Sequence, residues 1–262
     1  MTGVPVHESL PCPAATVGVV GAGRVGAALA AKFRAAGHEV VGVSGRSAAS
    51  QLRIQTLLPG VEIVTPEEVV RRADIVVLAV PDDALAGVAE ELAPYAHVDQ
   101  VILHTSGRHG LAVLVPFAGA GARTIAFHPA MTFTGTEVDL ERTCAFGLTA
   151  YTADHALAES LVAELGGTAE WIDEANRIAY HAGLAHGANH LTTLVAQAME
   201  ILRDAGVSDP SAVLRPLLTA ALDNTLAYGD AALTGPVARG DVNTVRAHAA
   251  SLMGTLDGDT LD

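Results

Sequence analysis

The sequence predicts an α/β protein in which a parallel sheet with helices on both faces is followed by an all-α helical domain. Short apolar runs alternate with helical stretches through the first half of the chain, as in sheets built from strand–helix–strand units. Residues 75–80 are entirely apolar, which is typical of a strand buried on both faces. From Asp173 onward the apolar residues recur at helical spacing instead. A chain of 262 residues can form one large domain or two moderate ones.

The first domain is expected to contain the strands. In chain order, we expect strands at residues 16–20, 40–43, 75–80, 101–104, 124–127, 145–149 and 169–172, and a further short one at 62–64. Helices are expected at residues 25–36, from Pro66 to about residue 73, and at 154–165. Open α/β sheets bind ligands beyond the carboxyl ends of their strands, so the polar residues that follow these strands are the site candidates.

One long helix is expected to begin the second domain. Apolar residues keep the helical period from Ile178 to Leu202, and the helix is expected to end at Gly206. About thirty residues at 1.5 Å each span ~45 Å, which is more than one small domain needs, so we expect a spine for a second domain. Further helices are expected at residues 211–226 and 241–253. The expected organisation is therefore a loose tail at residues 1–15, a first domain at 16–173 and a helical domain at 174–262.

A glycine-rich turn joins the first strand to the first helix. Gly21, Gly23 and Gly26 give the pattern G-x-G-x-x-G in this context, which is typical of Rossmann-type dinucleotide binding. The first glycine allows the tight turn, the second lets the backbone approach a pyrophosphate, and the third permits close packing of helix and strand. The helix N-terminus supplies free N–H groups and a partial positive charge. We expect Arg24 and Val25 to contact the cofactor together with the glycines.

The second strand ends without the acidic residue that holds the ribose of NAD in many such units. Residues 40–47 read VVGVSGRS, so Ser44, Arg46 and Ser47 occupy that place. A guanidinium can grip the 2′-phosphate of NADP through two parallel hydrogen bonds, whereas an aspartate would repel it. The sequence therefore favours NADP over NAD, with the two serines as additional donors. Arg24 in the turn is an alternative cation for the same phosphate.

Another expected cofactor contact follows the apolar strand at residues 75–80. Val80 and Pro81 lie in the loop that we expect beside the nicotinamide half of the cofactor. The next two residues, Asp82 and Asp83, are as suited to capping the following helix as to touching a ligand.

Two later strand ends carry groups that could serve the reaction. His104, Thr105 and Ser106 end one strand, and His128 ends the next. Their imidazole and hydroxyl groups could bind a substrate carboxylate or position the nicotinamide amide. We expect His104 to contact the cofactor, Thr105 the substrate, and Ser106 and His128 to take part in catalysis. His128 could equally be a turn residue before Pro129.

The composition excludes several function classes. A net charge of −14 and the absence of a basic cluster argue against nucleic acid or an anionic membrane as a partner. Apolar runs such as residues 75–80 are far shorter than the roughly twenty residues that cross a bilayer. Residues 1–15 lack the pattern of a signal peptide. We therefore expect a cytoplasmic protein that acts on a small molecule, with Cys12 and Cys144 as unpaired thiols.

Reduction of a carbonyl leaves a developing alkoxide, which must receive a proton. Lys32 is the only lysine of the chain and lies on the first helix, far from the strand ends. On the long helix, His181, His186 and Asn189 fall within an arc of about 140° at 100° per residue. We expect His181 or His186 to be the general acid and Asn189 to hold the carbonyl oxygen. Each histidine could instead be structural, and His186 with His190 could share a metal, although no acidic residue joins them and we expect no metal.

Five segments carry a resemblance to a known group of proteins. They are GAGRVG at 21–26, HTSG at 104–107, FHPAMTF at 127–133, YHAGLAHGANHL at 180–191 and TGPVARGD at 234–241. With these segments the chain resembles the Rossmann-like proteins that carry a DUF2520 helical domain, relatives of the 6-phosphogluconate-dehydrogenase-like group. That group includes ketopantoate reductase and pyrroline-5-carboxylate reductase. The resemblance implies an NADP-dependent oxidoreductase, with a small 2-oxo acid of the ketopantoate type as the leading substrate class.

The resemblance also implies features that the residues alone do not. Ketopantoate reductases use a lysine of the long helix with an asparagine a few residues on, and here His186 stands three residues before Asn189. Similar reductases dimerise through the helical domain, so Arg239 and Asp241 could complete the neighbour's substrate site, or Asp241 could merely cap the last helix. Similar proteins continue with a further helix beyond this sequence. A non-catalytic NADP-binding redox sensor and an imine- or deazaflavin-linked reductase are the rival functions.

Overall fold

A computed structural model describes residues 14–256 of the chain, with side chains described to residue 252. The expected tail at residues 1–15, except for its last two residues, and Cys12 lie outside the described part. The structure confirms the predicted fold class, because a mostly parallel sheet with helices is followed by a helical region. Two compact units make up the chain, residues 1–184 and residues 185–262.

The first unit is built on a seven-stranded sheet with the strand order β2-β1-β3-β4-β5-β6-β7. The strands are β1 (Thr16–Val20), β2 (Glu39–Ser44), β3 (Ile75–Leu78), β4 (Val101–His104), β5 (Arg123–Pro129), β6 (Ala145–Ala150) and β7 (Thr168–Trp171). All neighbouring pairs are parallel except β5 and β6, which pair in the antiparallel sense. The carboxyl ends of β1 to β5 therefore share one edge, where a ligand crevice is expected.

One expected strand is absent, and another ends two residues earlier than expected. Residues 62–64 form no strand, because Ile63 makes only an isolated bridge with Val43. The apolar run at residues 75–80 leaves the sheet after Leu78. The N–H of Ala79 still donates to the carbonyl of Val20, but Pro81 has no N–H to extend the ladder. Residues 79 and 80 therefore follow the strand at the edge of the sheet where the crevice is expected.

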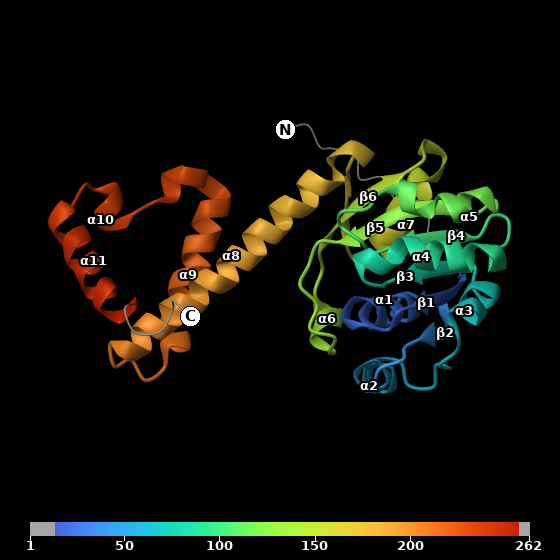
Figure 1. The fold of residues 1–262 in the computed structure, drawn as a ribbon, viewed down its shortest axis with the longest axis horizontal. Helices are drawn as coiled ribbons and strands as arrows, with labels where there is room; N and C mark the ends of the chain where they lie inside the picture. Colours follow the sequence, from blue (N-terminus) through green and yellow to red (C-terminus); the bar gives the residue numbers. More distant parts are fainter. Residues whose placement is uncertain (1–13, 257–262) are drawn as a thin grey trace, which may run out of the picture. The chain divides into compact units, whose positions relative to one another are not determined.

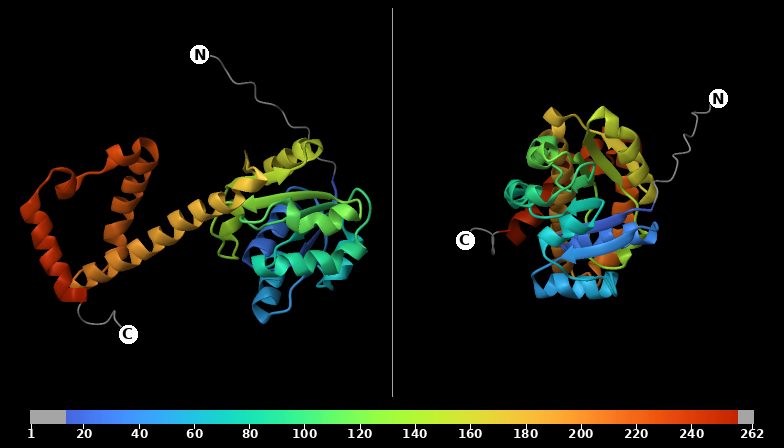
Figure 2. Two further views of the ribbon diagram at one scale, coloured as in Figure 1. Left: turned by 45° about the horizontal axis from the view of Figure 1, so that its top comes forward. Right: turned by 90° about the vertical axis from the view of Figure 1, so that its right-hand side faces the viewer.

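Helices cover both faces of the sheet, as Figures 1 and 2 show. Apolar residues of α1 (Arg24–Ala35), α2 (Ala48–Leu57) and α7 (His155–Glu164) pack on one face. Apolar residues of α3 (Pro66–Arg72), α4 (Asp82–Leu92) and α5 (Val115–Gly119) pack on the other. A short α6 (Val138–Glu141) lies in the loop after β5. Single 3-10 turns occupy Ala93–Tyr95, Leu111–Leu114, Thr152–Asp154, Glu174–Asn176 and Gly229–Ala232.

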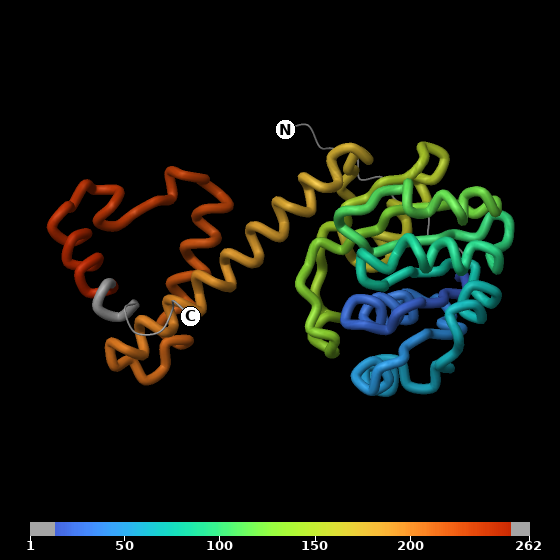
Figure 3. Tube along the Cα trace, in the orientation of Figure 1, coloured from blue at the N-terminus to red at the C-terminus, as the bar shows by residue number. Residues whose placement is uncertain are grey.

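The helical region contains α8 (Arg177–Asp204), α9 (Pro210–Tyr228), α10 (Gly235–Ala238) and α11 (Val242–Leu256), whose path Figure 3 traces. The division between the two units falls within α8, after Leu184, so the first two turns of this helix belong to the sheet unit. Among residues 185–252, only Pro210 and Leu214 are buried. No helix within residues 14–256 is both long and apolar enough to cross a membrane.

Candidate functional site: a dinucleotide cleft and a histidine–tyrosine cluster

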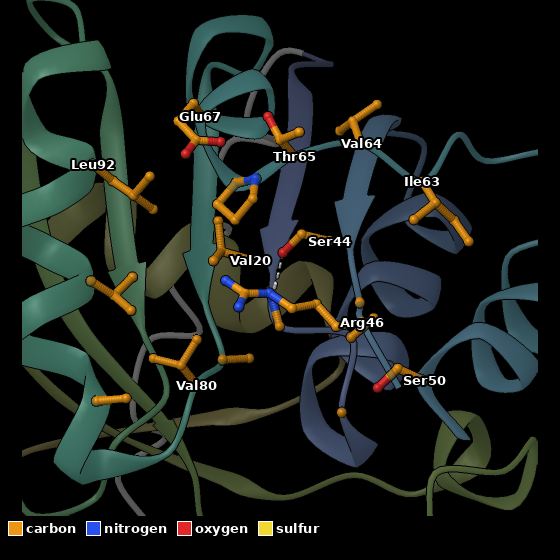
Figure 4. A pocket seen from close by; sticks show the side chains of 18 of the residues that line it. Val20, Ser44, Arg46, Ser50, Ile63, Val64, Thr65, Glu67, Val80 and Leu92 are labelled. Atoms are coloured by element: carbon orange, nitrogen blue, oxygen red, sulfur yellow. Dashed lines mark hydrogen bonds between the residues drawn. The ribbon is translucent and has the colours of Figure 1, made fainter. Parts of the chain in front are cut away.

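A cleft of about 710 Å³ opens beyond the carboxyl ends of β1, β2 and β3. The turn after β1, the segment from Ser44 to Arg46, the loop that leads into α3 and the turn from β3 into α4 form its walls. Figure 4 looks into this cleft. The predicted contacts Gly21, Gly23, Ser44, Arg46, Val80 and Pro81 all line it.

The glycine turn is shaped by two close approaches. Gly21 has a φ of +96°, and a Cβ on it would lie 2.5 Å from the carbonyl oxygen of Ala79. A Cβ on Gly26 would run into the carbonyl oxygen of Gly21. The N–H of Gly21 donates to Oγ of Ser44 at 3.1 Å, and the N–H of Ala22 donates to the Ser44 carbonyl at 2.7 Å. The end of β2 therefore holds the turn in place.

The N-terminus of α1 is open to an anion. Its N-cap is Gly23, no side chain caps the helix, and its first turn carries no acidic residue. A Cβ on Gly23 would meet nothing within 4 Å, so the backbone is exposed on the cleft side. The first N–H groups of a helix have no partner within it. Those of Arg24, Val25 and Gly26 are therefore free to bind a phosphate.

Arg46 extends across the cleft between the walls that carry Val80 and Ile63 (Figure 4). It is exposed, and no hydrogen bond or ion pair engages its guanidinium within residues 14–256. The backbone N–H of Glu67 and the hydroxyl of Thr65 lower the pKa of Glu67 most, and the positive charges of Arg71 and Arg46 lower it further. Arg46 is thus a free cation that faces one carboxylate across the cleft.

Ser47 and Arg24, the other predicted phosphate ligands of this region, do not line the cleft. Ser47 caps α2, because its Oγ accepts the N–H of Ser50 at 3.1 Å and lies 2.9 Å from the Ser50 hydroxyl. Ser50 lines the cleft, and Ser47 does not. The side chain of Arg24 leads away from the cleft, since a Cβ on Gly135 would lie 3.1 Å from its Cγ. Of the two candidate cations, Arg46 lines the cleft and Arg24 does not.

The acids after Pro81 form ion pairs. Both lie in the first turn of α4. Oδ2 of Asp82 is 3.4 Å from Nε of Arg108, and Oδ1 of Asp83 is 2.8 Å from its NH2. These pairs join the β3–α4 turn to the loop after β4.

His104 is fully buried, and both of its ring nitrogens have partners in its own loop. The N–H of Ser106 donates to Nδ1 at 3.2 Å, so the ring proton resides on Nε2, which donates to the carbonyl of Gly110 at 2.9 Å. Burial lowers the pKa of His104 to about 3. The imidazole is therefore neutral at neutral pH and shapes the loop that follows β4.

The loop after β4 brings its backbone against two other histidines. A Cβ on Gly107 would lie 3.0 Å from Nε2 of His128 and 2.5 Å from Cδ2 of His181. The rings of His128 and His181 meet edge to face with centroids 5.9 Å apart. The end of β4, the end of β5 and the first turns of α8 thus converge on one cluster. Thr105 follows β4 directly, and its N–H donates to the Leu78 carbonyl at 3.2 Å.

Tyr180 and Arg177 join this cluster, although neither is among the site residues predicted from the sequence. Nδ1 of His128 lies 2.9 Å from the phenol oxygen of Tyr180. Arg177 is fully buried, and its guanidinium donates to the Ser106 and Gly147 carbonyls and to Oγ1 of Thr149. Burial, Arg177 and His181 lower the pKa of His128 to about 4.

The candidates of the second unit are exposed. His186, Asn189 and His190 all lie on α8, and Nδ1 of His190 is 2.8 Å from the carbonyl of His186. Asp241 caps α11, because its carboxylate accepts the N–H of Thr244 at 3.1 Å and the hydroxyl at 2.8 Å. Arg239 is exposed in the loop before that helix.

Lys32 has a structural position on α1. Its Nζ donates to the carbonyls of Leu140 and Arg142 at 3.2 and 2.7 Å. This lysine therefore fixes the loop around α6 and is removed from the strand ends.

The strand order, the glycine turn and the cleft define a Rossmann-type protein with an added helical region. A family model described as a Rossmann-like domain matches residues 1–129, and the model described as DUF2520, a domain of unknown function, matches residues 144–260. The chain thus consists of a Rossmann-like domain followed by a DUF2520 domain.

Solved structures share this fold at low sequence identity. A proposed NADP oxidoreductase from Bacteroides fragilis is 23% identical, with a TM-score of 0.76 over 91% of each chain. The Plasmodium falciparum pyrroline carboxylate reductase with NADP bound is 17% identical, with a TM-score of 0.66 over 92% of each chain. An imine reductase variant from Myxococcus stipitatus in complex with NAD+ is 19% identical, with a TM-score of 0.56 over 81% of this chain and 76% of that chain. No curated protein matches the sequence.

Proposed function

We propose that this protein is an NADP-dependent oxidoreductase that reduces a small carbonyl or imine compound. The observation that carries the proposal is the cleft in which an uncapped helix N-terminus and an unpaired Arg46 lie at the ends of neighbouring strands. These groups match the two charged parts of the cofactor, the pyrophosphate and the 2′-phosphate. The cofactors named for two solved structures of this fold, NADP and NAD+, give further support.

The residues that hold the cofactor follow from the cleft. The N–H groups of Arg24, Val25 and Gly26 bind the pyrophosphate at the helix N-terminus. Arg46 binds the 2′-phosphate, with Ser50 beside it. Val80 and Pro81 pack against the nicotinamide half. When bound, the cofactor supplies a hydride to the substrate.

The cluster of His128, Tyr180 and His181 is the proposed reaction centre. It lies at the ends of β4 and β5, the next strand ends along the sheet edge from the cleft. Asn189 of α8 holds the substrate oxygen in this proposal. Thr105 binds the remainder of the substrate, and His186 stays the alternative proton donor on α8. In the proposed dimer, Arg239 completes the substrate site of the other subunit.

The substrate class rests on two kinds of support. The resemblance to ketopantoate reductases favours a small 2-oxo acid. The pyrroline carboxylate reductase and imine reductase that share the fold favour a cyclic imine instead. Both substrates accept a hydride at an sp² carbon and a proton at the neighbouring heteroatom, so one reaction centre suits both.

We further propose that the protein is a homodimer through its helical unit. Among residues 185–252, twelve large apolar side chains are exposed, namely Leu191, Leu194, Ile201, Val213, Leu217, Leu222, Leu226, Tyr228, Leu233, Val237, Val242 and Val245. Exposed apolar surface of this extent is typical of an interface. A reducing compartment such as the cytoplasm suits the unpaired thiol of Cys144.

The experiment that tests the function is a substrate panel. The protein is saturated with NADPH, and the loss of absorbance is followed with 2-oxo acids, including ketopantoate, and with cyclic imines. Turnover of at least one compound supports the proposal and identifies the class. Normal NADPH binding without any turnover would instead favour the redox sensor.

A further inference from the structure

We propose that Tyr180 is the proton donor of this reaction centre, with His128 as the group that restores its proton and Arg177 as the cation that stabilises its phenolate. The inference rests on the proposed reductase function and deepens it. Its geometric basis is the 2.9 Å contact between the phenol oxygen of Tyr180 and Nδ1 of His128. The two rings meet edge to face, with their planes at 88°, which suits a hydrogen bond that lies in the plane of the imidazole.

Tyr180 is the stronger candidate for the direct donor, because His128 is not an imidazolium at neutral pH. Burial, with smaller effects of Arg177 and His181, lowers the pKa of His128 to about 4. Its imidazole is therefore neutral at neutral pH. Burial raises the pKa of the Tyr180 phenol above its usual value of about 10. The phenol thus keeps its proton over the whole neutral range until a stronger base, such as an alkoxide, forms beside it.

Arg177 gives the site a positive charge that no carboxylate of the described residues pairs with directly, although the charge of Glu174 acts on it from beyond ion-pair distance. It is fully buried, and its partners are two carbonyls and a hydroxyl. Within residues 14–256 no carboxylate forms an ion pair with it, and its Nε has no hydrogen-bond partner. A buried cation without a counter-ion is costly for a fold. An anion that appears during the reaction would relieve that cost.

Tyr180 is a neighbour of Arg177 that can become such an anion. The guanidinium carbon of Arg177 lies 5.8 Å from the centre of the Tyr180 ring. Burial raises the pKa of this phenol most, whereas Arg177 and a hydrogen bond with the Gly147 backbone act to lower it. The cation therefore stabilises the phenolate more than the phenol, which is what a proton donor requires.

The proton moves along one path in this arrangement. The O–H bond of Tyr180 breaks, and its proton goes to the substrate oxygen that has become an alkoxide. The phenolate then takes the proton from Nδ1 of His128 while Nε2 of the same ring takes one from water. Tyr180 ends as a phenol, and His128 ends as a neutral imidazole whose proton is now on Nε2. Exchange of that proton with water returns the ring to the Nδ1 tautomer before the next turnover, so the net proton comes from solvent and leaves hydroxide there. The hydride of the proposed function supplies the two electrons.

Gly107 makes room for this path. A side chain at this position would collide with Nε2 of His128 and with the ring of His181. The loop after β4 therefore leaves Nε2 beside backbone that carries no side chain. Gly147 does the same for Tyr180, because a Cβ there would run into the phenol oxygen.

The activity test compares Tyr180→Phe with Tyr151→Phe, in which an exposed tyrosine loses the same hydroxyl. General acid catalysis contributes roughly 10²–10⁴-fold, so Tyr180→Phe should lower kcat at least about 100-fold with the best compound of the panel. KM and the NADPH dissociation constant should change little, and Tyr151→Phe should match the wild type. His128→Gln should lose less than Tyr180→Phe, because a glutamine amide can donate to the phenol but cannot relay a proton.

A second readout needs neither cofactor nor substrate. In protein labelled with ¹⁵N-histidine, His128 should give the nuclear resonance signals of a neutral ring near neutral pH. Tyr180→Phe should move its Nδ1 signal and leave those of the buried His38, which pairs with Glu164 instead, unchanged. An Nδ1 signal that does not respond would show that the pair does not form and would overturn the proposal.

The outcomes separate this inference from the function on which it rests. Wild-type turnover together with a Tyr180→Phe variant of unchanged kcat overturns the inference and leaves the reductase intact. A wild type that binds NADPH and reduces no compound overturns the reductase, and the inference with it. Loss of kcat in Tyr180→Phe with the expected change at His128 supports both.

Discussion

The N–H of Gly21 donates to the hydroxyl oxygen of Ser44 over 3.1 Å, so the glycine turn after β1 is fastened to the end of β2. Ser44→Ala should loosen the turn without removing a charge. The loss of one such hydrogen bond costs about 1 kcal/mol, or about fivefold in affinity. Calorimetric titration should show NADP and NAD weakened by the same factor. A loss confined to NADP would mean that the hydroxyl contacts the 2′-phosphate instead.

The carboxylate of Glu67 should lower the affinity of the wild-type protein for NADP. Its carboxylate lines the same cleft as Arg46 and is ionised at neutral pH, since its pKa lies below the usual value. A carboxylate repels the 2′-phosphate dianion through a largely solvent-filled cleft, where such terms are worth up to about 1 kcal/mol. Glu67→Gln should therefore tighten NADP a few-fold and leave NAD unchanged in a titration at low salt. Equal affinities in variant and wild type would place Glu67 away from the phosphate.

Acid should destabilise the sheet unit through its buried histidines. Burial lowers the pKa of His104 to about 3 and that of His128 to about 4, whereas histidine in an unfolded chain has a pKa of about 6.5. Between these values the unfolded state binds more protons, so the free energy of unfolding falls as the pH drops below about 6.5. The slope is up to about 1.4 kcal/mol per pH unit for each histidine.

The measurement is urea unfolding of the wild type and of His104→Gln at about pH 7 and about pH 5. Glutamine can still accept the Ser106 N–H and donate to the Gly110 carbonyl, but it does not titrate. The variant should therefore lose less stability on acidification than the wild type. The same loss in both proteins would show that His104 is not a buried neutral ring.

The proposed dimer predicts different effects for two leucines of similar exposure. Leu217 of α9 is 62% exposed and Leu52 of α2 is 63% exposed. Leu217→Glu places a charge in the apolar surface of the helical unit, where burial without a partner costs several kcal/mol. Sedimentation velocity should show a dimer for the wild type and for Leu52→Glu, and a monomer for Leu217→Glu. A wild type that sediments as a monomer would contradict the dimer.

The fold was predictable where local patterns determine the structure. The strands at residues 16–20 and 101–104 have the predicted bounds, because each is an apolar run that ends at polar or glycine residues. The helix α2 was not predicted, since only Ile54 and Leu57 of its ten residues are buried and the apolar pattern is weak. The antiparallel pairing of β5 and β6 could not be predicted either, because no local signal in either strand specifies which strand it pairs with.

The site was predictable in its charges and not in its long-range contacts. Arg46 was predicted as a phosphate ligand because no acidic residue stands at the end of β2. Its side chain lines the cleft in the structure. Tyr180 and His128 are 52 positions apart in the chain, so their hydrogen bond leaves no trace in sequence spacing. Arg177 reads as an ordinary charged residue at the start of a helix, yet tertiary packing buries it completely.

The central claim is that Arg46 selects a cofactor with a 2′-phosphate. Calorimetric titration of NADP and NAD into the wild type and Arg46→Asp tests it most directly. A charge-assisted pair of hydrogen bonds is worth about 1.5–3 kcal/mol, so the wild type should bind NADP roughly 10- to 100-fold tighter than NAD. Arg46→Asp should reverse that preference, because its carboxylate repels the phosphate and can accept the ribose hydroxyls. An unchanged ratio, or no heat with either dinucleotide, would contradict the account.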